Sequence, residues 1–136
     1  MNYKNIVNKI PEFCMTHWLL RIPLIVVFVQ QGSAKWPINI DDSPVEFTLL
    51  VWTFVVLGEL GAALGLLVGG IADYTKRTKE LGDIITRFSG ITIASIMTGV
   101  IWTGEPESFW DVILYDNLHV LLWVGGMYFA LRGNRT

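Results

Sequence analysis

Two charged residues stand inside strongly apolar stretches of the sequence. Arg21 interrupts the run WLLRIPLIVVFVQQGSAKW at positions 18–36, and Glu59 is the single charge between Phe47 and Ile71. A charge within a membrane is costly, so it usually pairs with an opposite charge or faces a protein interior. If the two stretches form consecutive antiparallel helices, both charges lie at similar depth. The sequence therefore predicts an intramembrane ion pair between Arg21 and Glu59.

Other roles for these two charges stay open at the level of sequence. A buried ion pair can fix the register of two helices and take no part in chemistry. The long side chain of Arg21 can also extend alone to the cytoplasmic surface. A proton path through Glu59 would suit a small transporter, but the sequence lacks the internal repeat that is typical of secondary transporters.

A second group of polar residues lies where two apolar segments begin or end. Gln31 and Lys35, with Gln30, lie at the end of the first segment. His119 follows Asp116 and Asn117 at the start of the last segment without acidic or basic residues. A histidine near a lysine and an amide can bind an anion or donate to a carbonyl oxygen, for instance in a quinone head group. We expect a polar pocket formed by Gln31, Lys35 and His119. The alternative is a hydrated rim of helix ends.

The histidines and the cysteine give little support for a metal or thiol site. Cys14 is the only cysteine, so no internal disulfide can form. His17 is expected near the cytoplasmic end of the first segment and His119 near the outer end of the fourth, so their depths differ too much for both to bind one haem iron. Cys14 and His17 form a C-x-x-H pair, but two ligands without a carboxylate are a weak metal signal. We predict no metal site and no covalent cofactor.

The composition indicates a membrane protein. Apolar residues make up 52% of the 136 residues and charged residues 16%, and the mean hydropathy is +0.48. A helix that spans a bilayer needs about 20 mostly apolar residues. Four segments approach this length, and the first three are 13–33, 47–71 and 88–103. The fourth has no acidic or basic residue over 117–131 and is expected to begin near Phe109. The predicted fold is all-α, a single domain over 1–136 that forms an integral membrane four-helix bundle.

The distribution of basic residues predicts the orientation. Lysines and arginines lie before the first segment, between the second and third, and after the fourth, at positions 4, 9, 76, 77, 79, 87, 132 and 135. The other two connections contain Lys35 as their only cation, among several acidic residues. Basic loops stay on the cytoplasmic side, so both termini are predicted to be cytoplasmic. The net charge of −2 argues against nucleic-acid binding.

Local signals predict how these segments start and pack. Ser43 to Glu46 resembles a capping box before the second segment. Within that segment, small residues recur at Gly58, Gly61, Gly65 and Gly69, a spacing that lets helices approach closely in lipid. The glycines predict a neighbouring helix, either in the same chain or in another subunit.

The ends of the first segment carry two further signals. Residues 1–12 place apolar residues at helical spacing beside Lys4 and Lys9, which favours a short helix on the membrane surface, although a disordered tail fits the same residues. Gly32, Ser33 and Ala34 look like a signal-peptide cleavage site. Arg21 would interrupt the apolar core of such a peptide, so we expect a retained span.

Taken together, the sequence resembles the DoxX family of small four-helix bacterial membrane proteins. The resemblance rests on several short motifs in order: Leu19-Leu20-Arg21, Gly32-x-x-Lys35, Glu59 followed by Gly65 and Gly69, Arg87, and Leu131-Arg132-Gly133. It implies a location in the bacterial cytoplasmic membrane and a link to membrane redox systems, including thiosulfate–quinone oxidoreduction.

Two functions follow as hypotheses from the resemblance and the residues. The first is the membrane component of a quinone-linked redox system, with quinone as the ligand and a partner as the source of electrons. The second is a non-catalytic structural or assembly subunit of a larger membrane complex. Both predict contact with the lipid bilayer and association with other subunits or with a second copy. No self-sufficient catalytic motif is visible.

Overall fold

The protein folds into helices alone over the residues that the computed structural model describes, which are 3–11, 15–39, 41, 43 and 47–135. Six helices follow in chain order: α1 (Tyr3–Val7), α2 (His17–Ala34), α3 (Leu49–Ala72), α4 (Lys79–Thr103), α5 (Phe109–Tyr115) and α6 (Asn117–Arg132). The all-α class predicted from the sequence is confirmed.

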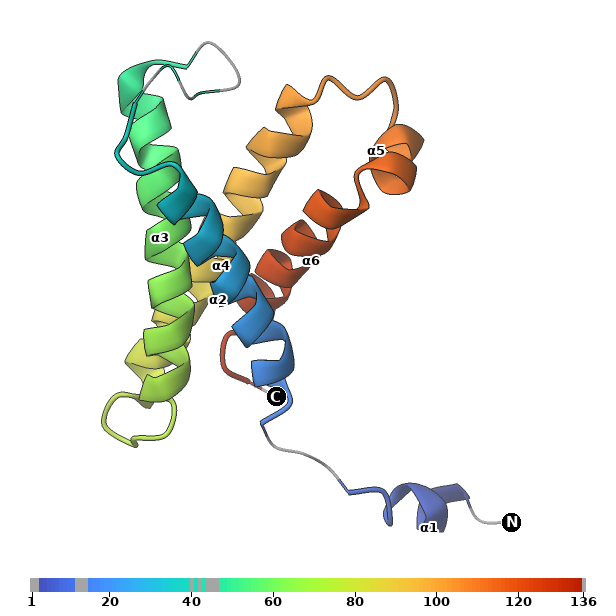
Figure 1. The fold of residues 1–136 in the computed structure, drawn as a ribbon. Helices are drawn as coiled ribbons and strands as arrows, with labels where there is room; N and C mark the ends of the chain where they lie inside the picture. The colour runs from blue at the N-terminus through green and yellow to red at the C-terminus, as the bar shows by residue number, and fades with distance from the viewer. Residues whose placement is uncertain (1–2, 12–14, 40, 42, 44–46, 136) are drawn as a thin grey trace.

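The four longer helices α2, α3, α4 and α6 run alternately up and down (Figure 1). The start of α2, the turn between α3 and α4, and the end of α6 lie together at one end of the assembly, called here the Asn134 end. The opposite end, called the α5 end, holds the end of α2, the start of α3, and α5. Helix α4 packs extensively on α3 and α6, and α3 also packs on α2, whereas α2 and α6 touch at few points.

Two of the described helices, α3 and α4, are each long and apolar enough to cross a membrane. The pair α5 and α6 passes the same test together, but it bends by 98° at Asp116. The fourth predicted segment is therefore not a straight helix from Phe109. Helix α4 also begins earlier than predicted, at Lys79, so that Asp83 and Arg87 belong to the helix.

The start of α3 differs from the predicted one. Helix α3 begins at Leu49, and the hydroxyl of Thr48 accepts a hydrogen bond from the Val51 N–H at 3.3 Å. Thr48 is thus the N-cap, because its side chain satisfies one of the free N–H groups of the first turn. Residues 44–46 of the predicted capping box lie outside the described residues.

The N-terminal segment forms a short helix, α1, that covers Tyr3–Val7. The helix lies apart from the four long helices in Figure 1, and Tyr3, Ile6, Val7 and Ile10 are exposed. A helix is therefore present where the sequence predicted one. Cys14, which was considered with His17 as a weak metal pair, lies outside the described residues.

Small residues bring the helices together, although not all the predicted ones take part. A Cβ atom on Gly58 would lie 3.1 Å from Ile96 Cδ1, and one on Gly65 or Gly69 would overlap Ser89 or Thr86 of α4. Gly61 has nothing within 4 Å of that position. Three of the four predicted glycines thus lie against α4, while Gly61 faces open space because it is turned to the outside of the bundle.

A further close approach, between α4 and α6, is one that the sequence pattern did not indicate. A Cβ on Gly90 of α4 would overlap the backbone of α6, and a Cβ on Gly126 of α6 would overlap the side chain of Ile93 and the backbone of α4. The two backbones therefore touch directly. A core of buried apolar residues lies beside this contact: Leu24, Phe28, Ala62, Ala63, Leu66, Ile93, Met97, Leu122 and Phe129.

Candidate functional site

Arg21 lies fully buried near the Asn134 end of the bundle. Its Nη1 donates to the Leu66 carbonyl oxygen at 2.6 Å and to Thr86 Oγ1 at 3.2 Å, and its Nη2 donates to Asn134 Oδ1 at 2.7 Å. The guanidinium carbon also lies 4.7 Å from the ring centre of Phe129. Neutral oxygens and an aromatic face therefore surround the charge, as in a cation–π contact with hydrogen bonds.

Asn134 connects this arginine to the rest of the Asn134 end. Its side-chain amide donates to the Gly69 carbonyl oxygen at 2.9 Å, and its Oδ1 also accepts from Thr86 Oγ1 at 2.8 Å. Its backbone N–H donates to Asp83 Oδ1 at 2.8 Å. Asn134 thus contacts α2, α3 and α4 at once. An apolar side chain at this position would leave several buried polar groups without hydrogen-bond partners.

A second arginine fixes the end of α6 beside Asn134. Arg87 Nε donates to Asp83 Oδ2 at 2.8 Å, and its terminal nitrogens donate to the carbonyl oxygens of residues 130, 131 and 132. These carbonyls have no partners within the helix because they belong to its last turn. Arg87 therefore caps α6 and places Gly133 and Asn134 against α4.

The predicted ion pair between Arg21 and Glu59 is not formed. Arg21 lies opposite Leu66 and Gly70, whereas the residue of α2 that meets Leu60 is Gly32. The prediction assumed that the two charges lie at equal depth, but α3 has 24 residues and α2 has 18. Arg21 binds at the level of Leu66, and Glu59 lies seven residues, about 10 Å, farther along α3 toward the α5 end.

Glu59 pairs with Lys35 instead. The Lys35 ammonium lies 2.6 Å from Glu59 Oε1 and 2.7 Å from Oε2. The side chain of Glu59 is 3% exposed and that of Lys35 is 21% exposed. The lysine reaches back from the end of α2 into the bundle, and its ammonium lies 5.8 Å from the ring centre of Trp52. The pair neutralises the charge that α3 carries in its middle.

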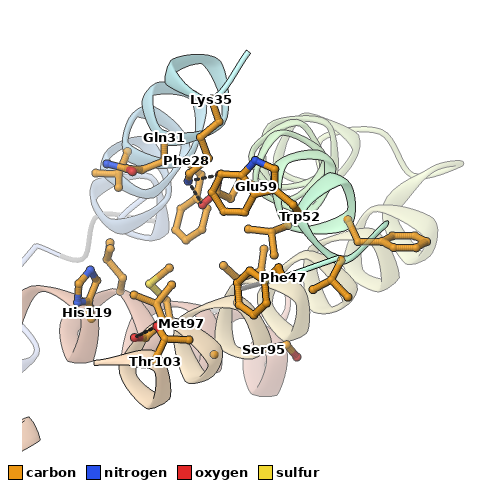
Figure 2. A pocket seen from close by; sticks show the side chains of 18 of the residues that line it. Phe28, Gln31, Lys35, Phe47, Trp52, Glu59, Ser95, Met97, Thr103 and His119 are labelled. Atoms are coloured by element: carbon orange, nitrogen blue, oxygen red, sulfur yellow. Dashed lines mark hydrogen bonds and ion pairs between the residues drawn. The ribbon is translucent and has the colours of Figure 1, made fainter. Parts of the chain in front are cut away.

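The Lys35–Glu59 pair forms part of the wall of a cavity of about 780 Å³ at the α5 end. Figure 2 shows the pair above the cavity, with Phe28 and Trp52 beside it and Met97 across from it. The walls come from α2, α3, α4 and α6, and they are mostly apolar. This volume is within the range of cavities that hold small organic ligands, roughly 300–1,000 Å³.

The structure brings Gln31, Lys35 and His119 to the wall of this one cavity. His119 Nδ1 lies 2.5 Å from Asp116 Oδ1. An ionised carboxylate can only accept, so Nδ1 carries the hydrogen and Nε2 is left for another partner. His119 is 38% exposed, and so it lies between the cavity and the surroundings.

The chain has no match among family models, curated proteins or solved structures.

The cavity can therefore offer both donors and acceptors to a ligand. An ammonium has three N–H groups, and Glu59 takes two of those of Lys35. The Gln31 amide can donate and accept, and Glu59 has further lone pairs. In the part of the chain that the structure describes, no group of three or more histidine, cysteine or acidic side chains is placed to hold a metal ion.

Sequence reasoning missed four side chains at these sites, namely Thr86, Asn134, Asp83 and Trp52. Thr86 and Asn134 are uncharged, and their role depends on contacts between residues 65 and 113 positions apart. Trp52 is buried, and its indole N–H has no acceptor among the described residues. The available signal was Lys35 itself, a cation at the end of the first apolar segment whose long side chain can reach back to Glu59.

Proposed function

We propose that α2, α3, α4 and α6 all cross the membrane, with the Asn134 end in the cytoplasm. The basic connections support this orientation, because the start of α2, the α3–α4 turn with Lys76 and Arg77, and the end of α6 lie together (Figure 1). A bacterial cytoplasmic membrane is the proposed location. Helix α2 carries the charge of Arg21, and the neutral oxygens around that residue make its burial tolerable.

The bend before α6 fits the same arrangement. Every residue of α5 is at least partly exposed, and Phe109, Trp110 and Tyr115 are among the most exposed aromatic residues. With α6 across the membrane, a 98° bend lays α5 along the membrane surface. Aromatic residues are enriched at that depth, so α5 serves as an interfacial helix rather than as part of a span.

The cavity at the α5 end is proposed to bind a membrane-dissolved quinone. A single observation carries this proposal: the cavity has apolar walls and one polar end without net charge. At that end Glu59 neutralises Lys35 at 2.6 Å. An anionic lipid head group would need net positive charge there. A neutral head with carbonyl oxygens instead needs hydrogen-bond donors, and Lys35 and Gln31 supply them.

The same end suits the reduced form of a quinone. Quinol hydroxyls need acceptors, and Glu59, Gln31 and the Nε2 atom of His119 provide them. Binding of both forms fits the membrane component of a quinone-linked redox system, as the resemblance to the DoxX family implies. In such a system, the electrons would come from or go to a partner protein.

The alternative function is a structural subunit of a larger membrane complex. It is favoured by Gly61, which is exposed on α3 with open space beside it and could accept a helix of another protein. The two functions differ in whether the purified protein holds a quinone.

The test is quinone binding by the purified protein in detergent and by single variants. Lys35→Ala and His119→Ala should each weaken binding, because each removes a side chain that lines the cavity. Asn117→Ala is the matched control, since Asn117 is exposed on the same turn of α6 as His119 and does not line the cavity. A wild-type protein that binds no quinone would refute the proposal and leave the structural-subunit function.

A further inference from the structure

The polar groups of the cavity are concentrated on one side. Gln31 and Lys35 come from α2 and His119 from α6, and Figure 2 shows Gln31 and His119 on the side away from Phe47 and Ser95. Among the lining residues of α3, Glu59 is the only charged one, and it is bonded to Lys35. The head of a bound quinone therefore belongs on the side formed by α2 and α6.

The opposite side, between the outer halves of α3 and α4, is apolar. Its lining includes Val55, Ile96 and Val100. Two hydroxyls in this wall are already used by their own helix, because Ser95 Oγ donates to the Ile91 carbonyl and Thr103 Oγ1 donates to that of Val100. They add no free donor for a ligand, so this side suits a hydrocarbon chain.

Gly99 leaves room at this side of the cavity. It lines the cavity, it is exposed, and a Cβ atom placed on it would meet nothing within 4 Å. The close packing of α3 on α4 is still present one turn earlier, where Gly58 meets Ile96. Beyond that contact the two helices diverge toward the α5 end (Figure 1).

We infer that the hydrocarbon tail of the bound quinone leaves the cavity between α3 and α4, over Gly99, while its head lies at Lys35 and His119. This inference rests on the proposed function and adds the tail route and a residue that sets tail specificity. A side chain at position 99 would stand in the path of the tail and leave the head side unchanged.

The experiment measures the affinities of the full chain for two quinones that share one head group, one with a long isoprenoid tail and one without a tail. Gly99→Leu should bind the tailed quinone about tenfold more weakly, because the loss from a steric clash is typically between about fivefold and a hundredfold. Its affinity for the tail-less quinone should be unchanged. Gly61→Leu is the matched control, because Gly61 also faces open space but does not line the cavity.

The possible outcomes separate the inference from the proposed function. If Gly99→Leu loses affinity equally for both quinones, or for neither, the tail route is wrong. Binding by the wild-type protein would still support the proposed site. A wild-type protein that binds neither quinone refutes the proposed function itself. Should Gly99→Leu not fold by circular dichroism, Gly99→Ala replaces it, and a smaller loss confined to the tailed quinone is then expected; equal affinities would again overturn the route.

Discussion

The pairing of Glu59 with Lys35 rather than with Arg21 can be tested by two double-mutant cycles. The first combines Lys35→Met with Glu59→Gln, and the second combines Arg21→Leu with the same Glu59→Gln. The quantity measured in each is the coupling term in the free energy of unfolding. A cycle reports an interaction between two side chains only when they touch or share partners.

The structure sets the expected size of each coupling. Lys35 and Glu59 are 2.6 Å apart, and the carboxylate is 3% exposed, so their coupling should be about 1–3 kcal/mol, within the range for contacting residues. It should fall short of the full cost of a lone buried charge, about 3–5 kcal/mol, because Lys35 keeps some access to its surroundings. Arg21 is bonded at the level of Leu66, about 10 Å along α3 from Glu59. Its coupling with Glu59 should be below about 0.5 kcal/mol.

The assay is reversible unfolding of the purified protein in mixed detergent micelles, followed by circular dichroism. Coupling in the Arg21 cycle and additivity in the Lys35 cycle would together refute the register of α2 on α3 described above. Coupling in both cycles would mean that Glu59 is shared between the two cations. Additivity in both would mean that the Lys35–Glu59 pair contributes little to the stability of the bundle.

Three further predictions concern the Asn134 end and the topology. Asn134→Ala should lower the free energy of unfolding by about 1–3 kcal/mol, because it leaves buried donors and acceptors unpaired; chemical unfolding measures this, and an unchanged midpoint contradicts it. Gly133→Ala should lower the free energy of unfolding by about 1 kcal/mol or more, since φ is +60° there and the added methyl overlaps side chains of α4. Gly61→Ala should be neutral or mildly stabilising. Equal melting temperatures of the two variants would contradict this prediction. In a cysteine-free background, Glu107→Cys should react with a membrane-impermeant maleimide added to intact cells. Thr78→Cys should react only after lysis. Labelling of Thr78→Cys in intact cells would contradict the proposed orientation.

The helical class and the approximate positions of the long helices could be predicted from the sequence, because apolar runs of this length favour membrane-spanning helices over other structures. Sequence reasoning also grouped Gln31, Lys35 and His119, since all three lie at helix ends that short connections bring together. It failed at the register of α2 on α3, which depends on the 14 residues between those helices and on where α3 begins. The predicted segments 13–33 and 47–71 have their centres near residues 23 and 59, which would place Arg21 close to Glu59. In the structure, however, Gly32 lies opposite Leu60.

The bend at Asp116 was also beyond reach of the pattern, for a different reason. Residues 109–132 contain enough apolar residues for one long helix, and hydropathy cannot distinguish a straight helix from a broken one. The break depends on local bonds: Asp116 holds the ring of His119 and leaves helical geometry itself, with φ −118° and ψ 43°. Likewise, no charge pattern indicates that Asn134 is the partner of Arg21, because an amide supplies oxygen without charge.

The bond between Arg21 and Asn134 also constrains how the protein is made. The two residues are 113 positions apart, and synthesis at about 5–20 residues per second separates their appearance by roughly 6–23 s. Throughout that interval α2 contains a guanidinium whose amide partner has not yet been made. Thr86 arrives earlier, yet still 65 residues after the arginine. If α2 crosses the membrane as proposed, then water, lipid phosphates or the insertion machinery would solvate Arg21 during insertion, and α2 would reach its final depth only after residue 134 has been made.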